Sequence, residues 1–317
     1  MGTKRGSVAT LIVMVLTLSI LMGTLSVYAA NTWSQDRLYR EIEAKGFKRE
    51  IPAVDYTDEA IEEISKLLPK RFSDIDGSEW YIKDLALLTS KGIVNGVGDG
   101  TKFAGTNTVT RSEFWAMQGR LQGIGTKLSK DIMKDISSIL EDSRLDNVDD
   151  LVNSWYLPYY YGQKGIPFGL YTHEDMLKPI YRGEVAVLIF QYLAKGESTD
   201  REIGEIADKT YFKDIPNKLT SLNASENGSK LHKEQMEELG IQTGYYYPKF
   251  NDVVDGRIDM LERTKIAINW CNAVGIMCGL PDKTSGWNKE LTRGEAVATL
   301  ARAFRYANRL PEEKRVK

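Results

Sequence analysis

The sequence holds few of the residues on which metal sites and disulfide frameworks depend. Its 317 residues include two cysteines and two histidines. His173 and His232 lie far apart, and two thiols with two distant imidazoles do not make a zinc site. On one continuous helix Cys271 and Cys278 would lie about 10 Å apart, too far for a disulfide, although a turn at Gly275 would bring them closer. We interpret both as small buried apolar residues, and we expect no metal and no cofactor.

Catalytic motifs are missing as well. The chain has no Gly-x-Ser-x-Gly, no His-Glu-x-x-His and no phosphate-binding loop. It also has no surplus of basic residues, because 42 lysines and arginines face 44 carboxylates, and this argues against nucleic acid as a partner. The acidic residues are spread without a distinct site, so only a glycosidase carboxylate pair stays open on sequence grounds. We expect a protein that is not an enzyme.

Only one long apolar run is present, at the N-terminus. Lys4 and Arg5 precede an apolar stretch over residues 8–21, and small residues close the segment at Ala29 and Ala30. This order is typical of a secretory signal peptide, residues 1–29, cleaved after Ala29. The alternative is an uncleaved membrane anchor, because the apolar stretch approaches spanning length. We favour cleavage, which predicts a secreted protein with only transient membrane contact.

What the sequence does contain is an internal repeat. Gly-Ile-x-x-Gly occurs three times, beginning at Gly92, Gly165 and Gly275, and Arg-x-Glu follows each second glycine after 15, 13 and 14 residues. A helical stretch precedes each glycine core and an apolar helical run follows each Arg-x-Glu. The unit is therefore helix, glycine-rich loop, helix, in a mainly α protein. One such pair cannot bury its apolar face alone, so we expect three units to pack together. The three elements are Arg111-Ser112-Glu113, Arg182-Gly183-Glu184 and Arg293-Gly294-Glu295.

Two segments lie outside the repeats. Residues 30–70 predict two helices broken near residues 46–55, the second with an apolar stripe through Ile61 and Ile64. Residues 197–249 form an insertion that carries the sequon Asn223-Ala224-Ser225 and a run of three tyrosines, 245–247. Either segment could be the part of the protein that is presented to other molecules. The predicted organisation is a signal peptide (1–29), N-terminal helices (30–70), repeat one (71–130), repeat two (131–196), the insertion (197–249) and repeat three (250–310).

The first repeat resembles the S-layer homology (SLH) domain in its landmarks. These are Phe72-Ser73-Asp74-Ile75, Trp80-Tyr81, the glycine-rich loop over residues 92–103 and Val109-Thr110-Arg111-Ser112-Glu113. Only Gly105 departs from the pattern, because a proline is usual there. The other repeats match less completely. The second keeps Trp155 and Arg182-Gly183-Glu184 but has Tyr181 in place of the threonine, and the third keeps Phe250-Asn251-Asp252-Val253 and Thr292-Arg293-Gly294-Glu295 without a counterpart of Trp80.

The resemblance implies a fold and a function. The three repeats would form a pseudo-threefold helical bundle with prongs, and the chain would bind a secondary cell wall polymer, often pyruvylated, that is attached to peptidoglycan. This places the protein at the cell wall or surface of a Gram-positive-type bacterium. The alternative is a structural surface-layer component or an assembly protein, with other surface-layer proteins as partners. A cell-wall hydrolase or its regulator ranks third.

The Thr-Arg-x-Glu elements also suggest a binding site. Thr110 with Glu113 and Thr292 with Glu295 fit the capping box that pins the start of a helix. A helix N-terminus that carries an arginine suits a carboxylate such as a pyruvyl group. Nearby glycines let a sugar approach the backbone, and the tryptophans could stack on sugars, although core packing is the commoner role at helical spacing. The predicted ligand-binding residues are Arg111, Arg182, Arg293, Glu113, Glu295, Thr110, Thr292, Gly96, Gly98, Asp99, Trp80 and Trp155.

Overall fold

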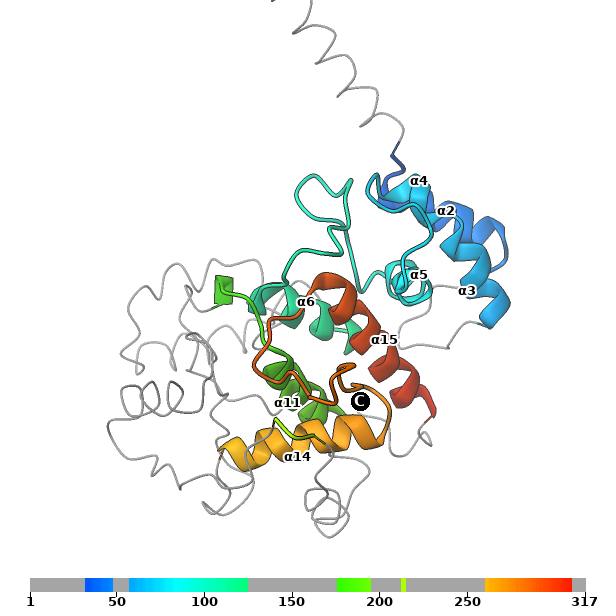
Figure 1. Cartoon of the computed structure of the whole chain (residues 1–317). Helices are drawn as coiled ribbons and strands as arrows, with labels where there is room; N and C mark the ends of the chain where they lie inside the picture. Colours follow the sequence, from blue (N-terminus) through cyan, green and yellow to red (C-terminus); the bar gives the residue numbers. More distant parts are fainter. Residues whose placement is uncertain (1–31, 48–56, 125–175, 195–211, 215–259, 310–317) are drawn as a thin grey trace, which may run out of the picture. The chain divides into compact units, whose positions relative to one another are not determined.

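The computed structural model is mainly helical over the part of the chain that it describes (Figure 1). Eight α-helices and four isolated β-bridges occur in these ranges, and none of their residues forms a β-strand. The prediction of a mainly α protein is confirmed for them. No helix there has both the length and the apolar character needed to cross a membrane. The described residues are 32–47, 57–124, 176–194, 212–214 and 260–309, so the predicted signal peptide, Trp155 and the insertion sequon lie outside them.

The described residues divide into two compact units. The first unit holds the N-terminal helices together with the first helix and most of the glycine-rich loop of repeat one. The second unit holds all three helices that begin at Arg-x-Glu. Repeat one is therefore shared between the units. The first unit comprises residues 32–47, 57–90 and 95–104, and the second comprises residues 91–94, 105–124, 176–194, 212–214 and 260–309.

Four helices make up the first unit: α2 (Gln35–Ala44), α3 (Asp58–Ser65), α4 (Leu68–Arg71) and α5 (Ile82–Ser90). Both α2 and α3 pack against α5. The apolar side chains on the packed faces are fully or almost fully buried, as the hydrophobic effect requires. They are Leu38 and Ile42 of α2, Ile61 and Ile64 of α3, and Leu85 and Leu88 of α5.

The ends of α2 and α3 follow from local sequence. Ser34 and Thr57 cap the two N-termini, each accepting a main-chain hydrogen bond three residues on. Gly46, with φ of 86°, ends α2, and Phe47 N donates to Ile42 O at 3.2 Å. This is a Schellman motif, which needs a left-handed residue that glycine adopts without strain. The predicted break between two N-terminal helices near residue 46 is confirmed.

Gln35 ties the N-terminal helices to repeat one. Its Nε2 donates to the main-chain oxygen of Thr89 in α5 at 3.1 Å, and its Oε1 accepts from Arg71 Nε at 3.0 Å. Arg71 also donates to the main-chain oxygen of Gly100 in the glycine-rich loop. The described part of the N-terminal segment is thus packed into the first unit and supports the loop.

Four helices make up the second unit: α6 (Arg111–Leu121), α11 (Arg182–Leu193), α14 (Met260–Ala273) and α15 (Arg293–Arg309). Helix α11 packs along α14, and α15 contacts both α6 and α11. Gln118 Nε2 of α6 donates to the main-chain oxygen of Leu188 in α11 at 3.1 Å. The three helices that begin at Arg-x-Glu therefore contact one another.

The two cysteines are free, but only one is buried. Cys271 lies in α14 with no exposed surface, and burial raises the pKa of its thiol. Gly275, with φ of 78°, follows the end of this helix. Cys278 lies beyond that turn and is exposed. The interpretation of both cysteines as buried apolar residues is therefore right for Cys271 and wrong for Cys278.

Candidate functional site

The capping boxes predicted at two Arg-x-Glu helices are confirmed. Thr110 Oγ1 accepts from Glu113 N at 3.3 Å, and Glu113 Oε2 accepts from Thr110 N at 2.9 Å. Thr292 and Glu295 repeat both bonds at 3.3 and 2.9 Å. At α11 the carboxylate of Glu184 accepts from Tyr181 N at 2.9 Å, but Tyr181 makes no side-chain cap. The three helices thus start alike except for the missing hydroxyl.

The segments that lead into these helices form a closed ring of main-chain hydrogen bonds. Val109 N donates to Leu291 O at 2.9 Å, Leu291 N donates to Ile180 O at 3.0 Å, and Ile180 N donates to Val109 O at 2.9 Å. Each of the three residues lies two places before its arginine and is both donor and acceptor. The backbone therefore joins the three elements in one cycle.

A second ring is made by side chains. Arg111 Nε and Nη2 donate to the two carboxylate oxygens of Glu184 at 2.9 and 3.1 Å. The other two pairs follow in the same rotational order. They are Arg182 Nη1 with Glu295 Oε1 at 3.4 Å and Arg293 Nη1 with Glu113 Oε1 at 2.9 Å. Each arginine thus bonds to the glutamate of another element, and the six residues are called the Arg–Glu ring below.

The three arginines of the Arg–Glu ring are buried. Arg111, Arg182 and Arg293 are 0%, 8% and 5% exposed. Charged groups out of water need partners, and here the protein's own carboxylates supply them. The side chains of Glu113 and Glu295 are still 29% and 30% exposed. Sequence reasoning placed these arginines at helix starts correctly but missed their glutamate partners.

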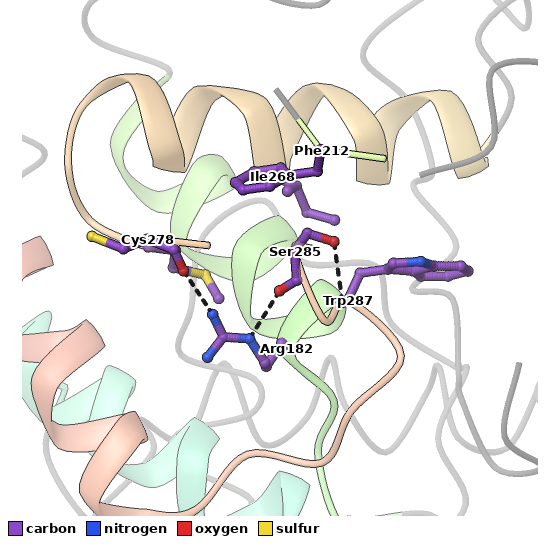
Figure 2. Close-up of a pocket in the computed structure, with 7 residues that line it drawn as sticks. Arg182, Phe212, Ile268, Cys278, Ser285 and Trp287 are labelled. Atoms are coloured by element: carbon purple, nitrogen blue, oxygen red, sulfur yellow. Dashed lines mark hydrogen bonds between the residues drawn. The ribbon is translucent and has the colours of Figure 1, made fainter. Parts of the chain in front are cut away.

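Arg182 also lines a small cavity (Figure 2). Its Nε donates to Ser285 O at 3.1 Å and its Nη2 donates to Cys278 O at 3.0 Å. Burial lowers the pKa of this guanidinium, and Glu295 opposes that effect. The cavity measures about 10 Å³, room for one water molecule at most and not for a sugar. Its lining residues are Arg182, Phe212, Ile268, Met277, Cys278, Ser285 and Trp287.

Two aspartates clamp the loops that precede α6 and α15. Asp74 accepts from Phe103 N at 2.8 Å and from Ala104 N at 2.7 Å. Asp214 accepts from Ser285 N at 2.7 Å and from Gly286 N at 2.9 Å. The paired amides lie eight and seven residues before the arginine of each element, so the two clamps correspond.

The second clamp involves an element that sequence reasoning missed. Phe212-Lys213-Asp214-Ile215 repeats the lettering Phe-x-Asp-Ile of Phe72 to Ile75, which was the available signal. The expected counterpart, Phe250-Asn251-Asp252-Val253, lies outside the described residues. Left-handed residues mark the same place in both loops, since Ala104 has φ of 58° and Gly286 has φ of 60°.

The predicted loop residues lie together in the first unit. Asp99 Oδ1 accepts from Thr101 N at 2.9 Å and from Thr101 Oγ1 at 2.7 Å, and these bonds lower the pKa of Asp99. Gly98 is exposed with φ of 57°. A Cβ at Gly96 would lie 2.2 Å from Gly100 O, so the loop itself requires that glycine. Gly98 and Asp99 are left at the surface.

Trp80 is 65% exposed, so its interpretation as a core residue is wrong. Helix α5 begins at Ile82, two residues after Trp80, which lies in the preceding turn. The predicted site residues therefore fall into two groups. Those of the Arg–Glu ring and its caps belong to the second unit, whereas Trp80, Gly96, Gly98 and Asp99 belong to the first. No cluster of three His, Cys, Asp or Glu side chains suited to a metal occurs among the described residues.

Comparison with known families gives one match. The family model of the S-layer homology domain matches residues 71–114, from the end of α4 to the first turn of α6. Domains of this family are non-catalytic modules that anchor proteins to the bacterial cell wall or surface layer. No characterised protein and no solved structure matches the chain significantly.

Proposed function

We propose that this protein is a secreted, non-catalytic wall-binding protein. In this proposal its signal peptide, residues 1–29, is removed, and its repeats bind a secondary cell wall polymer attached to peptidoglycan. The S-layer homology match over residues 71–114 is the observation that carries the proposal. The predicted landmarks of that repeat are also in place, since Asp74 clamps the loop and Thr110 caps α6.

We further propose that Arg182 and Arg293 mark two more repeats. The support is the correspondence of bonds among the three elements. The main-chain N–H of each of the three arginines donates to a main-chain oxygen that lies four residues before the arginine of the next element.

 The acceptors are Lys178, Lys289 and Asn107, so the offset of four residues holds in all three cases. This regularity favours a pseudo-threefold arrangement. The bonds of Asp214 to Ser285 and Gly286 favour Phe212 as the start of the third repeat.

The exposed residues of the first repeat are the proposed contacts of the polymer. Trp80, Gly98 and Asp99 lie at the surface of the first unit. A pyruvyl carboxylate could also compete with Glu295 for Arg182 or with Glu113 for Arg293, because those glutamates keep about 30% of their side-chain surface. Arg111 is the least accessible of the three, since it and Glu184 are 0% and 1% exposed.

Sedimentation with purified walls tests the proposal. The mature chain should pellet with native walls and stay in the supernatant when the polymer has been extracted. Trp80→Ala should weaken pelleting. The matched control is Leu177→Ala, which removes the other strongly exposed large apolar side chain among the described residues and should not weaken pelleting. Equal pelleting with intact and extracted walls would reject the polymer as the ligand. Large particles in light scattering without any wall would favour the surface-layer alternative.

A further inference from the structure

Trp80 is the most exposed large apolar side chain among the described residues, at 65%. Its ring meets that of Tyr81 edge-on, with centroids 5.4 Å apart and planes at 84°. Tyr81 is 7% exposed and contacts the fully buried ring of Phe103, at 5.5 Å. The indole is therefore fixed at the outer end of a row of rings while most of its surface is open. A side chain held in this way loses little conformational entropy when a ligand covers it.

The turn before Trp80 holds two carboxylates in place. Glu79 accepts from Asp76 N at 2.9 Å and from Gly77 N at 3.0 Å. Asp76 Oδ1 accepts from Ser78 N at 2.8 Å and from Ser78 Oγ at 2.6 Å. These bonds from Ser78 lower the pKa of Asp76. Both carboxylates are thus tied to the turn that presents the indole.

No cation of the neighbouring sequence offsets this negative charge. Between Arg71 and Lys83 the chain carries Asp74, Asp76 and Glu79 and no lysine or arginine. The two flanking cations are engaged elsewhere. Arg71 donates to Gln35 and to the main chain of Gly100, and Lys83 Nζ lies 2.8 Å from Glu62. The turn that carries Trp80 is therefore negatively charged, and this charge favours a positively charged ligand.

Trp33, in the same unit, differs from Trp80 because cations of the protein lie over its ring. The guanidinium of Arg37 lies 4.8 Å from its ring centroid and the ammonium of Lys70 lies 5.0 Å from it. Cations are attracted to the face of an indole in this way. Among the described residues no lysine or arginine lies over the ring of Trp80. The protein thus covers one indole with its own cations and leaves the other open beside carboxylates.

We propose that Trp80, Asp76 and Glu79 form a subsite for a hexosamine whose amine is not acetylated. The pyranose ring would stack on the indole, and its ammonium would face the two carboxylates. This inference rests on the proposed wall-binding function, because the wall glycan would supply the sugar. The subsite has the opposite charge preference to the arginines of the second unit, since its carboxylates repel a ligand carboxylate.

Titration of the mature chain with two sugars tests the subsite. The probes are a chitosan tetramer, with free amines, and a fully N-acetylated chitin tetramer. The indole N–H resonance of Trp80, assigned from its loss in Trp80→Phe, reports on the site itself. The chitosan tetramer should shift this resonance and bind about three- to ten-fold more tightly than the chitin tetramer. Equal affinities, or shifts that leave Trp80 unaffected, would overturn the proposal.

A charge-removing variant with a matched control sharpens the test. Asp76→Asn keeps the oxygen that accepts from Ser78 and removes the charge, so the preference for the chitosan tetramer should fall at least about two-fold. Asp282 accepts from Thr284 N and Oγ1 in the same kind of turn in the second unit. Asp282→Asn should therefore leave the preference unchanged. A preference that survives in Asp76→Asn would contradict the assignment.

Sedimentation with two kinds of wall distinguishes the proposed subsite from the proposed wall binding. Native walls and walls treated with acetic anhydride, which acetylates free amines, are compared in sedimentation. Weaker pelleting with the acetylated walls supports the subsite. Equal pelleting with both would overturn the subsite and leave wall binding standing, whereas no pelleting with either would reject wall binding itself.

Discussion

At the scale of single residues, Arg111 forms a buried ion pair with Glu184. It is fully buried and makes two parallel bonds to Glu184, which is itself 1% exposed. Replacing a buried ion pair as a whole can be neutral, but removing one partner leaves an unpaired buried charge. Arg111 therefore has a structural role in addition to the binding role predicted for it.

Arg111→Ala should destabilise the protein by about 3–5 kcal/mol, because it leaves Glu184 buried without its partner. Arg111→Lys should recover only part of this, since lysine keeps the charge and loses the two-pronged geometry. Thr110→Ala removes only a helix cap and should cost about 1 kcal/mol. Denaturant unfolding of the three variants measures these differences.

The comparison of stability with binding separates the two roles of Arg111. A structural role predicts that Arg111→Ala weakens wall binding only as far as it unfolds the protein. Weaker binding by a variant with unchanged stability would instead support direct contact with the polymer. An Arg111→Ala protein as stable as the wild type would contradict the buried ion pair.

At the scale of elements, the aspartate clamps connect segments that are distant in sequence. Asp214 joins residues 212–214 to the loop before α15, 71 residues later. It holds two main-chain amides and the hydroxyl of Ser285. The Nε1 of Trp287 also donates to the main-chain oxygen of Asp214 at 3.1 Å. This short segment is therefore bonded to the loop of the third element in spite of its distance along the chain.

Asp214→Ala should destabilise the second unit by about 1–3 kcal/mol, because it leaves main-chain donors without an acceptor. Asp74→Ala should have a similar effect on the first unit for the same reason. Asp252→Ala is the control, because Asp252 belongs to the alternative Phe-x-Asp element. Thermal melts rank the three variants. A larger loss with Asp252→Ala than with Asp214→Ala would place the start of repeat three at Phe250.

At the scale of the whole molecule, the second unit depends on all three Arg-x-Glu elements at once. Its main-chain ring and its Arg–Glu ring each close only when α6, α11 and α15 are present. Removing one element would leave bonding groups of the other two exposed or unpaired. The unit should therefore unfold cooperatively rather than element by element.

A chain that ends at residue 259 tests this dependence. It lacks Arg293 and Glu295, so Glu113 and Arg182 lose their ring partners. We expect α6 and α11 to lose their helical structure, and the helical content measured by circular dichroism should fall by more than α14 and α15 contribute. A shortened chain that keeps the rest of its helical signal and a cooperative melt would show that the repeats fold independently.

Local sequence by itself determined the helical class, the repeat, the break near residue 46 and the two capping boxes. The reason is that caps and helix ends rest on bonds between residues three to five places apart, which neighbouring side chains decide. The tertiary structure alone decided which glutamate each arginine bonds to, across 73, 113 and 180 residues. It also decided that Arg111 is buried, that Trp80 is exposed and that Asp214 forms the second clamp. These features depend on how distant segments pack. The Phe-x-Asp-Ile lettering at Phe212 marks a candidate for the second clamp, but the sequence offers Phe250-Asn251-Asp252 as well, and only packing decides between them.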